Sequence, residues 1–443
     1  MTQGRPVSHI VSFALPLMAG NVFQQLYTVV DTMIVGKALG VDALAALGAS
    51  DWLNWMMLGI IQGLTQGFAI QMAQDFGAGQ TERLRRTVGN SVVLAAISTV
   101  FLLLLGQAAA APMLSLLHTP SEIIGNALLY LRIMFAGVPI VMSYNMLASV
   151  LRALGDGKTP LQAMVVASLT NIGLDLLFVL VFHWGIAGAA VATLIAQMVS
   201  GGFCLWHIRE VTILSCRRDD FRLRAQTAGR LFVLGLPMAF QNSIISIGGM
   251  IVQTVVNGFG VVFIAGFTAT NKLYGVLEIA ATSYGYAMTT YVGQNLGAGE
   301  YTRIRKGVRA ALLVAVVTSV VIALCMLFFG RSILGFFLSG SEQVVTQAME
   351  IAYRYLSIMS ICLPILYLLH IIRSALQGMG NTVLPMVSGI AEFIMRTLAA
   401  LLLPGMVGES GIFYAEVTAW TGADVILVSS YFLVLRHIAK KLK

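Results

Sequence analysis

Twelve long apolar stretches divide the chain, and each is long enough to cross a membrane as a helix. About 20 residues of helix span the hydrocarbon core of a bilayer. Because that core offers no hydrogen-bonding partners, each stretch must satisfy its own backbone groups, as a helix does. We therefore predict an all-α polytopic membrane protein with twelve transmembrane helices. The stretches cover residues 10–35, 45–72, 88–112, 123–151, 161–182, 187–208, 231–256, 263–294, 310–330, 346–374, 384–404 and 411–435.

The composition excludes a soluble globule. Only 10% of the residues are charged, against about 25% in a soluble domain. The first apolar stretch follows Arg5 as in a signal peptide, but it continues past Phe23 to Asp31 without a small-residue cleavage site. We therefore predict a first membrane helix there. The four cysteines show no metal or disulfide spacing, so we expect no disulfide or metal framework. We also expect no cofactor.

The basic residues indicate the orientation. With the N-terminus in the cytoplasm, 21 of the 27 Lys and Arg residues, from Arg5 through Arg373 to Lys443, fall in segments predicted on the inner side, as the positive-inside rule requires. They lie between apolar stretches and not in one patch, so we expect a lipid bilayer and no nucleic acid as partner. We predict a monomeric, multi-pass plasma-membrane protein with both termini cytoplasmic.

The chain also repeats itself at a spacing of about 220 residues. The matched pairs are Leu15–Pro16 with Leu236–Pro237, Gln74–Gly79 with Gln294–Gly299, Leu151–Asp156 with Leu376–Asn381, and Pro139 with Pro364. Six helices per repeat is an even number, so both halves enter the membrane from the same side. We predict two pseudo-symmetric six-helix halves, residues 1–208 and 230–443, around a central cavity, with a cytoplasmic linker at 209–229.

Acids inside the apolar stretches are few, and each needs a reason because its insertion costs about 2.5–3.5 kcal/mol. They are Asp31, Asp51, Asp175, Glu278, Glu392, Glu416 and Asp424. Asn171 and Asp175 are four residues apart and so share a helix face. An amide oxygen beside a carboxylate suits a hard cation such as Na⁺. A second acid nearby would let the same site hold a proton instead, so the ion stays open.

Several motifs together resemble the multidrug and toxic compound extrusion (MATE) transporters. The matching segments are residues 24–32 (QQLYTVVDT) with Val35–Gly36, the two Gly-Ala-Gly loops, Asn171–Asp175 (NIGLD), Gly185–Thr193 (GIAGAAVAT), and Gly411–Trp420. The resemblance covers nearly the whole chain. It implies antiport, in which a drug-like molecule, often an organic cation, leaves the cell as Na⁺ or H⁺ enters.

The resemblance also implies a cation site in the N-terminal half. The matching positions are Asp31, Asn171, Asp175 and Thr193, with Na⁺ possible at the first three. A capped carboxylate at Asp31 and an interhelical hydrogen-bond clamp at Asn171 and Asp175 are the structural alternatives.

The resemblance further implies that bending of the first helix at Pro16 accompanies ion binding. Pro237 occupies the matching place in the second half. A proline in mid-helix removes a backbone hydrogen bond and permits a kink. A plain packing kink is the alternative for either proline.

The second half departs from this pattern. At a spacing of 225, Asn171 falls on Arg396 and Asp175 on Ala400, so we expect no symmetric second cation site. Glu392 and Arg396 stand four residues apart, which predicts a structural ion pair.

Further polar residues interrupt the apolar stretches. Glu278 is a candidate contact for a cationic substrate. The other candidates to line a substrate cavity are Gln24, Tyr27, Asn145, Gln241 and Asn242. Interhelical hydrogen bonding is the alternative for each.

We predict a secondary active multidrug efflux transporter and no enzyme. The chain has no GxxxxGK[ST] nucleotide-binding loop. A lipid-linked saccharide flippase of the same wider superfamily is one alternative, although such proteins usually carry basic cavities and extra helices. A membrane-embedded transferase is another, but the one adjacent acid pair, Asp219–Asp220, lacks the rest of a metal-binding motif.

Overall fold

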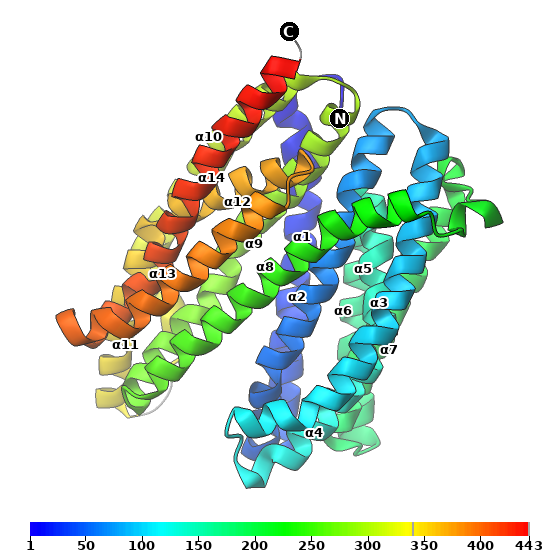
Figure 1. Ribbon diagram of the computed structural model, residues 1–443. Coiled ribbons are helices and arrows are strands. Elements are labelled where there is room, and N and C mark those ends of the chain that lie inside the picture. Colours follow the sequence, from blue (N-terminus) through cyan, green and yellow to red (C-terminus); the bar gives the residue numbers. More distant parts are fainter. Residues whose placement is uncertain (339–340, 442–443) are drawn as a thin grey trace. The chain divides into compact units, whose positions relative to one another are not determined.

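The computed structural model describes residues 1–338 and 341–441, so Lys443 lies outside it. All regular elements in this described part are helices (Figure 1). They are α1 (Pro6–Leu39), α2 (Val41–Gly77), α3 (Thr81–Leu116), α4 (Ser121–Ala136), α5 (Val138–Ala153), α6 (Lys158–Asp175), η1 (Leu176–Val181), α7 (Gly185–Glu210), η2 (Thr212–Leu214), η3 (Arg218–Phe221), α8 (Ala225–Asn257), α9 (Val261–Gly297), α10 (Tyr301–Gly335), α11 (Glu342–Ile361), α12 (Leu363–Gly378), α13 (Val383–Val407), η4 (Glu409–Phe413) and α14 (Tyr414–Lys441).

A helix or a bent helix pair occupies each of the twelve predicted stretches. Within the described residues, nine helices are long and apolar enough to span a membrane, and two bent pairs raise the number to eleven. The twelfth is α9, which has 37 residues but also carries Lys272 and Glu278. The chain is therefore an all-α polytopic membrane protein, as predicted.

Two stretches predicted as single helices are bent. The axes of α4 and α5 meet at 48°, and those of α11 and α12 also meet at 48°. Pro139 and Pro364 lie in the first turns of α5 and α12, where a missing backbone N–H costs nothing. These two prolines are repeat-matched, so the bends belong to the internal symmetry. Apolar length alone does not distinguish a straight span from a bent one.

The repeated Gly-Ala-Gly loops make equivalent contacts in the two halves. Arg83 Nε lies 3.0 Å from Asp75 Oδ1, and Arg303 Nε donates to Asn295 Oδ1 at 3.0 Å. The last glycine of each loop has a positive φ, 67° at Gly79 and 74° at Gly299. L-residues with side chains rarely adopt that conformation. The sequence repeat is therefore also a repeat of structure.

By internal contacts the described chain forms two compact units. One comprises residues 15–243 with 297–299, and the other comprises residues 1–14, 244–296 and the part from 300 onward. Both α1 and α8 continue through their proline, Pro16 and Pro237. Three expectations stay predictions. They are the division into halves 1–208 and 230–443, the cavity between them, and a kink at either proline.

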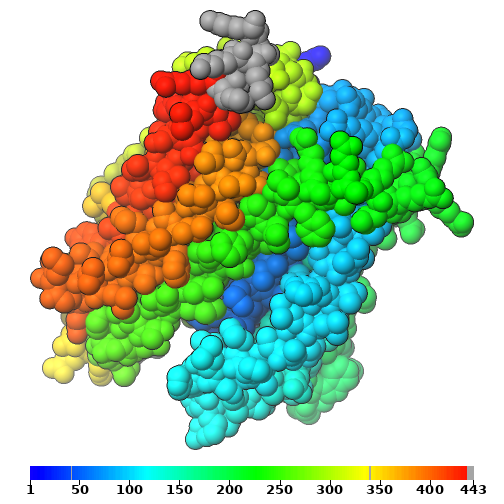
Figure 2. Space-filling view, viewed as in Figure 1, coloured from blue at the N-terminus to red at the C-terminus, as the bar shows by residue number. Residues whose placement is uncertain are grey.

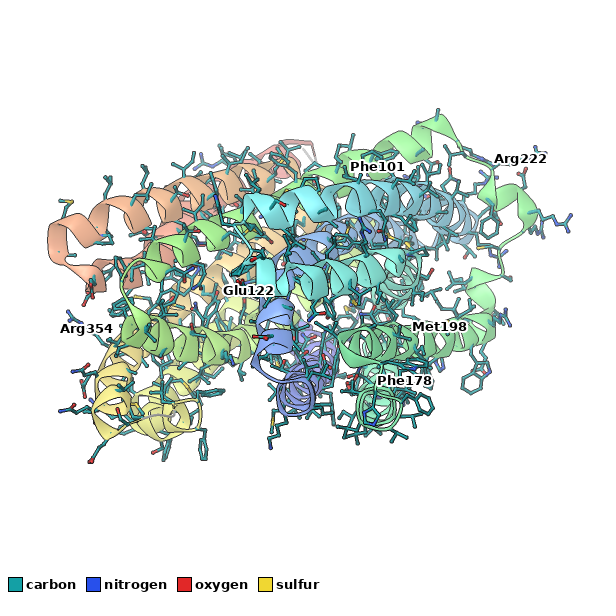
Figure 3. The ribbon with its side chains drawn as sticks, turned by 90° about the horizontal axis from the view of Figure 1, so that it is seen from below. Phe101, Glu122, Phe178, Met198, Arg222 and Arg354 are labelled. Carbon is teal, nitrogen blue, oxygen red and sulfur yellow. The ribbon has the colours of Figure 1, made fainter. Side chains whose placement is uncertain are left out.

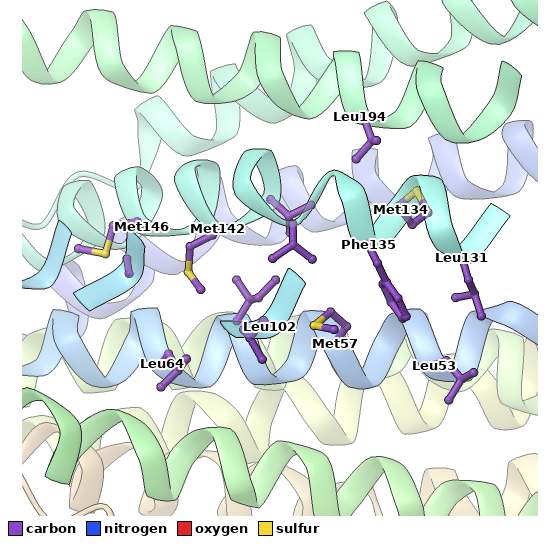
Figure 4. Packing of buried hydrophobic residues seen from close by; sticks show 14 of the residues in the cluster. Leu53, Met57, Leu64, Leu102, Leu131, Met134, Phe135, Met142, Met146 and Leu194 are labelled. Atoms are coloured by element: carbon purple, nitrogen blue, oxygen red, sulfur yellow. The ribbon is translucent and has the colours of Figure 1, made fainter. Parts of the chain in front are cut away.

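The first of these units has an extensive apolar interior. Most of its side chains come from α2, α3, α4, α5 and α7, and others come from α1, η1, η2 and α8. Figure 4 shows part of this packing. The residues labelled there are Leu53, Met57, Leu64, Leu102, Leu131, Met134, Phe135, Met142, Met146 and Leu194. Large apolar side chains also lie on the outside, such as Phe101, which is 63% exposed. Such residues suit contact with lipid.

The predicted linker is held against α3. Arg85 Nε donates to the Ile213 carbonyl at 2.9 Å, and Asn90 Nδ2 donates to the Asp220 carbonyl at 3.2 Å. The backbone N–H of Arg224 donates to Asn90 Oδ1 at 2.8 Å. The space-filling view shows the green linker segment beside the blue part of α3 (Figure 2). This segment is docked and does not run free in solvent.

Small residues allow α2 and α8 to approach closely. A Cβ added at Gly67 would lie 2.3 Å from the Gly235 Cα, and one added at Gly63 would lie 2.4 Å from the Ala239 nitrogen. Spacings of small residues by four are the usual device for close helix packing in membranes. Asn242 Nδ2 adds a hydrogen bond to the Gly59 carbonyl at 2.9 Å.

We expect Gly67→Ala to lower the thermal stability of the purified protein. The added methyl group forces α2 and α8 apart, and overpacking of this kind costs about 1–3 kcal/mol. Gly48→Ala is the matched control on the same helix, because an added Cβ there meets nothing within 4 Å. Thermal unfolding in detergent measures both variants. Equal melting temperatures for the two would contradict the tight crossing.

Candidate ion-coupling site

Four buried polar residues of α1, α6 and α7 form the candidate site. Asp31 lies on α1 and is 8% exposed, while Asn171 and Asp175 lie one turn apart on α6 and are 1% and 0% exposed. Thr193 on α7 is 9% exposed. All four belong to the same compact unit. The structure thus brings together the positions that the sequence predicts.

Hydrogen bonds fix the direction of the amide group. Asn171 Nδ2 donates to Thr193 Oγ1 at 3.4 Å, and Thr193 Oγ1 donates to the Ala189 carbonyl at 3.1 Å. This arrangement turns the Asn171 Oδ1 atom away from Thr193. In the described structure that oxygen has no hydrogen-bond partner. Thr193 therefore orients Asn171, and its own hydroxyl proton is already used.

The two carboxyl groups interact with each other. Asp31 and Asp175 are side-chain neighbours within hydrogen-bonding reach. Yet among the described residues no donor reaches Asp31 Oδ1 or either carboxyl oxygen of Asp175. Neither acid has a Lys or Arg in an ion pair within this part of the chain. The site thus presents four oxygens without a protein donor, counting Asn171 Oδ1.

These oxygens suit one small cation. Two adjacent carboxylates repel each other strongly in a low-dielectric interior unless a positive charge lies between them. A shared proton removes that repulsion, and Na⁺ does so as well because it takes hard oxygen ligands. The arrangement fits both ions.

A π-helical segment that the sequence does not predict follows this site directly. η1 begins at Leu176, the residue after Asp175. Phe182 N donates to the Leu177 carbonyl at 2.9 Å, and π segments frequently occur at functional sites. Phe178 stacks on Trp184 with ring centroids 4.7 Å apart. Figure 3 labels Phe178 on this segment. The run LLFVLV has no residue that signals the change of helix type.

The predicted cavity residues have differing surroundings. Gln24 and Tyr27 are half-buried on α1, and Gln241 is buried on α8. Asn145 Nδ2 donates to the Val141 carbonyl of its own helix at 2.8 Å. The amide of Asn242 is used in the α2–α8 contact described above. Asn145 and Asn242 thus have structural partners.

In the other unit, Glu392 and Arg396 are paired at 2.9 Å. Glu278 lies 3.3 Å from His370 and keeps 35% of its side chain exposed. Arg373, which we predict among the cytoplasmic basic residues, is only 11% exposed and contacts Glu392 at 2.7 Å. Its side of the membrane stays a prediction. A basic residue near the end of an apolar stretch can turn inward on a helix, and hydropathy does not show this.

Asp219 and Asp220, the adjacent acids considered for the transferase alternative, make their contacts within the linker. Asp219 pairs with Arg222 at 3.3 Å and with Arg224 at 3.2 Å. Asp220 Oδ2 accepts the backbone N–H of Arg217 at 2.7 Å. Within the described residues there is no cluster of three His, Cys, Asp or Glu side chains that would hold a metal ion.

The fold is that of a polytopic membrane transporter. The family model named MatE matches residues 16–177 and 237–402. The chain belongs to this family, which consists of transporters.

Individual relatives align over nearly their whole length. The chain is 28% identical to the probable multidrug resistance protein YpnP of Bacillus subtilis, covering 93% of this chain and 91% of the relative. It is 24% identical to the probable multidrug resistance protein NorM of Thermotoga maritima, covering 96% and 91%. The fold matches the crystal structure of a MATE protein in complex with MaL6, with a TM-score of 0.91 at 22% identity, covering 99% and 98%.

If Na⁺ occupies the site, we expect Asn171→Leu to weaken Na⁺ binding at least 10-fold, because the change removes one oxygen ligand at similar side-chain volume. A tenfold change in binding corresponds to about 1.4 kcal/mol. Binding of radioactive Na⁺ to the purified protein measures this. Asn145→Leu is the matched control and should bind as the unmodified chain does. Unchanged binding in Asn171→Leu would remove Asn171 from the ligand set.

Proposed function

We propose that this transporter exports small organic molecules, often cationic, in exchange for Na⁺ or H⁺. The observation that carries the proposal is the pair of buried carboxyls at Asp31 and Asp175, whose oxygens lack donors in the described structure. The multidrug resistance proteins among its relatives support drug-like substrates.

The site residues have separate roles in this proposal. Asp31 and Asp175 bind the ion, Asn171 adds a neutral oxygen, and Thr193 holds Asn171 in place. Ion binding offsets the repulsion between the carboxyls and favours one direction of access, while substrate binding favours the other. Bending of α1 at Pro16 is part of this change, with Pro237 as its counterpart in α8.

The substrate path is proposed to run between the two halves. Glu278, with its partly exposed carboxyl, is the proposed contact for a cationic group. Gln24, Tyr27 and Gln241 are further proposed lining residues. Asn145 and Asn242 fit the role of helix contacts better, because their amides already donate to carbonyls.

An inward ion gradient supplies enough free energy to drive such exchange. An inward gradient supplies about 2.3 kcal/mol per charge per 100 mV, enough to concentrate a substrate by tens of fold. The proposed transporter is a monomer in the plasma membrane. The excess of basic residues in the segments predicted as inner supports placing both termini in the cytoplasm. No cofactor takes part in this scheme.

Dye export from proteoliposomes tests the proposal, with a Na⁺ gradient and a pH gradient imposed separately. Asp175→Asn should lower gradient-driven export of a fluorescent organic cation at least 10-fold, because the amide cannot give up a proton and carries no charge to hold Na⁺. The gradient that drives the unmodified protein identifies the coupling ion.

Asp219→Asn is the matched control, since Asp219 lies 59% exposed in the linker. It should export at the unmodified rate. Full gradient-driven export by Asp175→Asn would refute the coupling role. If neither gradient drives efflux of any cation tried, the saccharide flippase alternative gains support.

A further inference from the structure

Three helices of the C-terminal part, α12, α13 and α14, bring together a buried charge network. Arg373 Nη2 on α12 lies 2.7 Å from Glu392 Oε2 on α13. Arg396 Nη2 lies 2.9 Å from Glu392 Oε1 and 2.8 Å from Glu416 Oε2 on α14. The side chains are only 5–17% exposed. Two arginines offset two glutamates, so these four residues are electrically balanced.

Asp424 is a fifth charged residue next to this balanced network. It is 7% exposed, and among the described residues neither of its carboxyl oxygens has a hydrogen-bond partner. The charged groups that act on it are Arg373 and Glu392. Ten residues separate it from Tyr414, which places it about 15 Å along α14 from the start of that helix.

The remaining groups near α14 do not neutralise Asp424. Tyr355 on α11 is buried near Glu416 and Arg396, while Arg354 on α11 and Glu409 on η4 are exposed. From α9, Tyr274 and Glu278 act on the network at Glu416. His370, on α12, is engaged with Glu278. Asp424 thus makes a third acid beside two arginines.

A buried carboxylate without donors is costly, and a bound proton removes that cost. Na⁺ fits this place less well because it needs several oxygens at once. Glu392 already gives both its oxygens to arginines, and Arg373, on the neighbouring helix α12, acts on Asp424 as a positive charge. A proton needs one acceptor atom only.

We propose that Asp424 binds a proton and forms a second ion site, separate from Asp31 and Asp175. With the proton in place, Arg373 pairs with Glu392 as in the structure. When the proton leaves for water, the Asp424 carboxylate accepts from the Arg373 Nε atom, which has no partner in the described structure. Arg373 is then drawn from Glu392. Protonation of Asp424 thereby controls the Arg373–Glu392 contact between α12 and α13. This inference does not depend on the proposed export function.

Infrared difference spectra of the full chain in lipid, between mildly acidic and mildly alkaline buffer, test this inference. We expect Asp424→Asn to lose one component of the protonated-carboxyl C=O band. Asp31→Asn should leave that component in place, which separates it from the N-terminal site. Asp219→Asn should leave the band unchanged, because the linker carboxylate is exposed and paired.

A conservative variant covers the case in which Asp424→Asn does not fold. Asp424→Glu should keep the component at a shifted frequency, since the acid remains but its surroundings change. Arg373→Gln should also change the component, because it removes the partner of the deprotonated state. An unchanged band in folded Asp424→Asn, or an unshifted band in Asp424→Glu, would overturn the proposal.

Discussion

The structure depends on one constraint, which is that the hydrocarbon core supplies no hydrogen bonds. Backbone groups meet it by forming helices, and most polar side chains meet it with contacts such as Thr193 to the Ala189 carbonyl. The exceptions are therefore informative. Asp31, Asp175 and Asp424 hold carboxyl oxygens without donors in the described residues. Each is a place where we propose that a cation or a proton binds.

The two halves place buried charge differently on a repeated scaffold. In the N-terminal half, two acids and an amide face one another with no basic partner in the described structure. In the C-terminal half, Arg373 and Arg396 neutralise two glutamates from the inside. The matched bends of 48° and the matched loop contacts show that the backbone kept its symmetry. The buried charged side chains did not.

Sequence reasoning predicted what depends on length, composition and short spacings. The twelve stretches and the repeat belong to this class. The family resemblance, and not spacing, implied that Asn171 and Thr193 share a site. It did not predict the bends at Pro139 and Pro364, because a proline fits equally inside a kinked helix or in the first turn of a new one. It also did not predict the burial of Arg373 against Glu392, since burial on one side of a helix depends on neighbours distant in sequence.

The π-helical segment after Asp175 changes the direction in which its side chains point. Its hydrogen bonds span five residues where an α-helix spans four, so one extra residue is taken up within the run from Leu176 to Val181. One residue corresponds to about 100° of rotation in an α-helix. Because η1 ends at Val181 and α7 begins separately at Gly185, the change affects the side chains within this run. They point away from where a helical wheel started at Lys158 would put them. A one-residue gap in an alignment here would record this geometry and would not indicate an error.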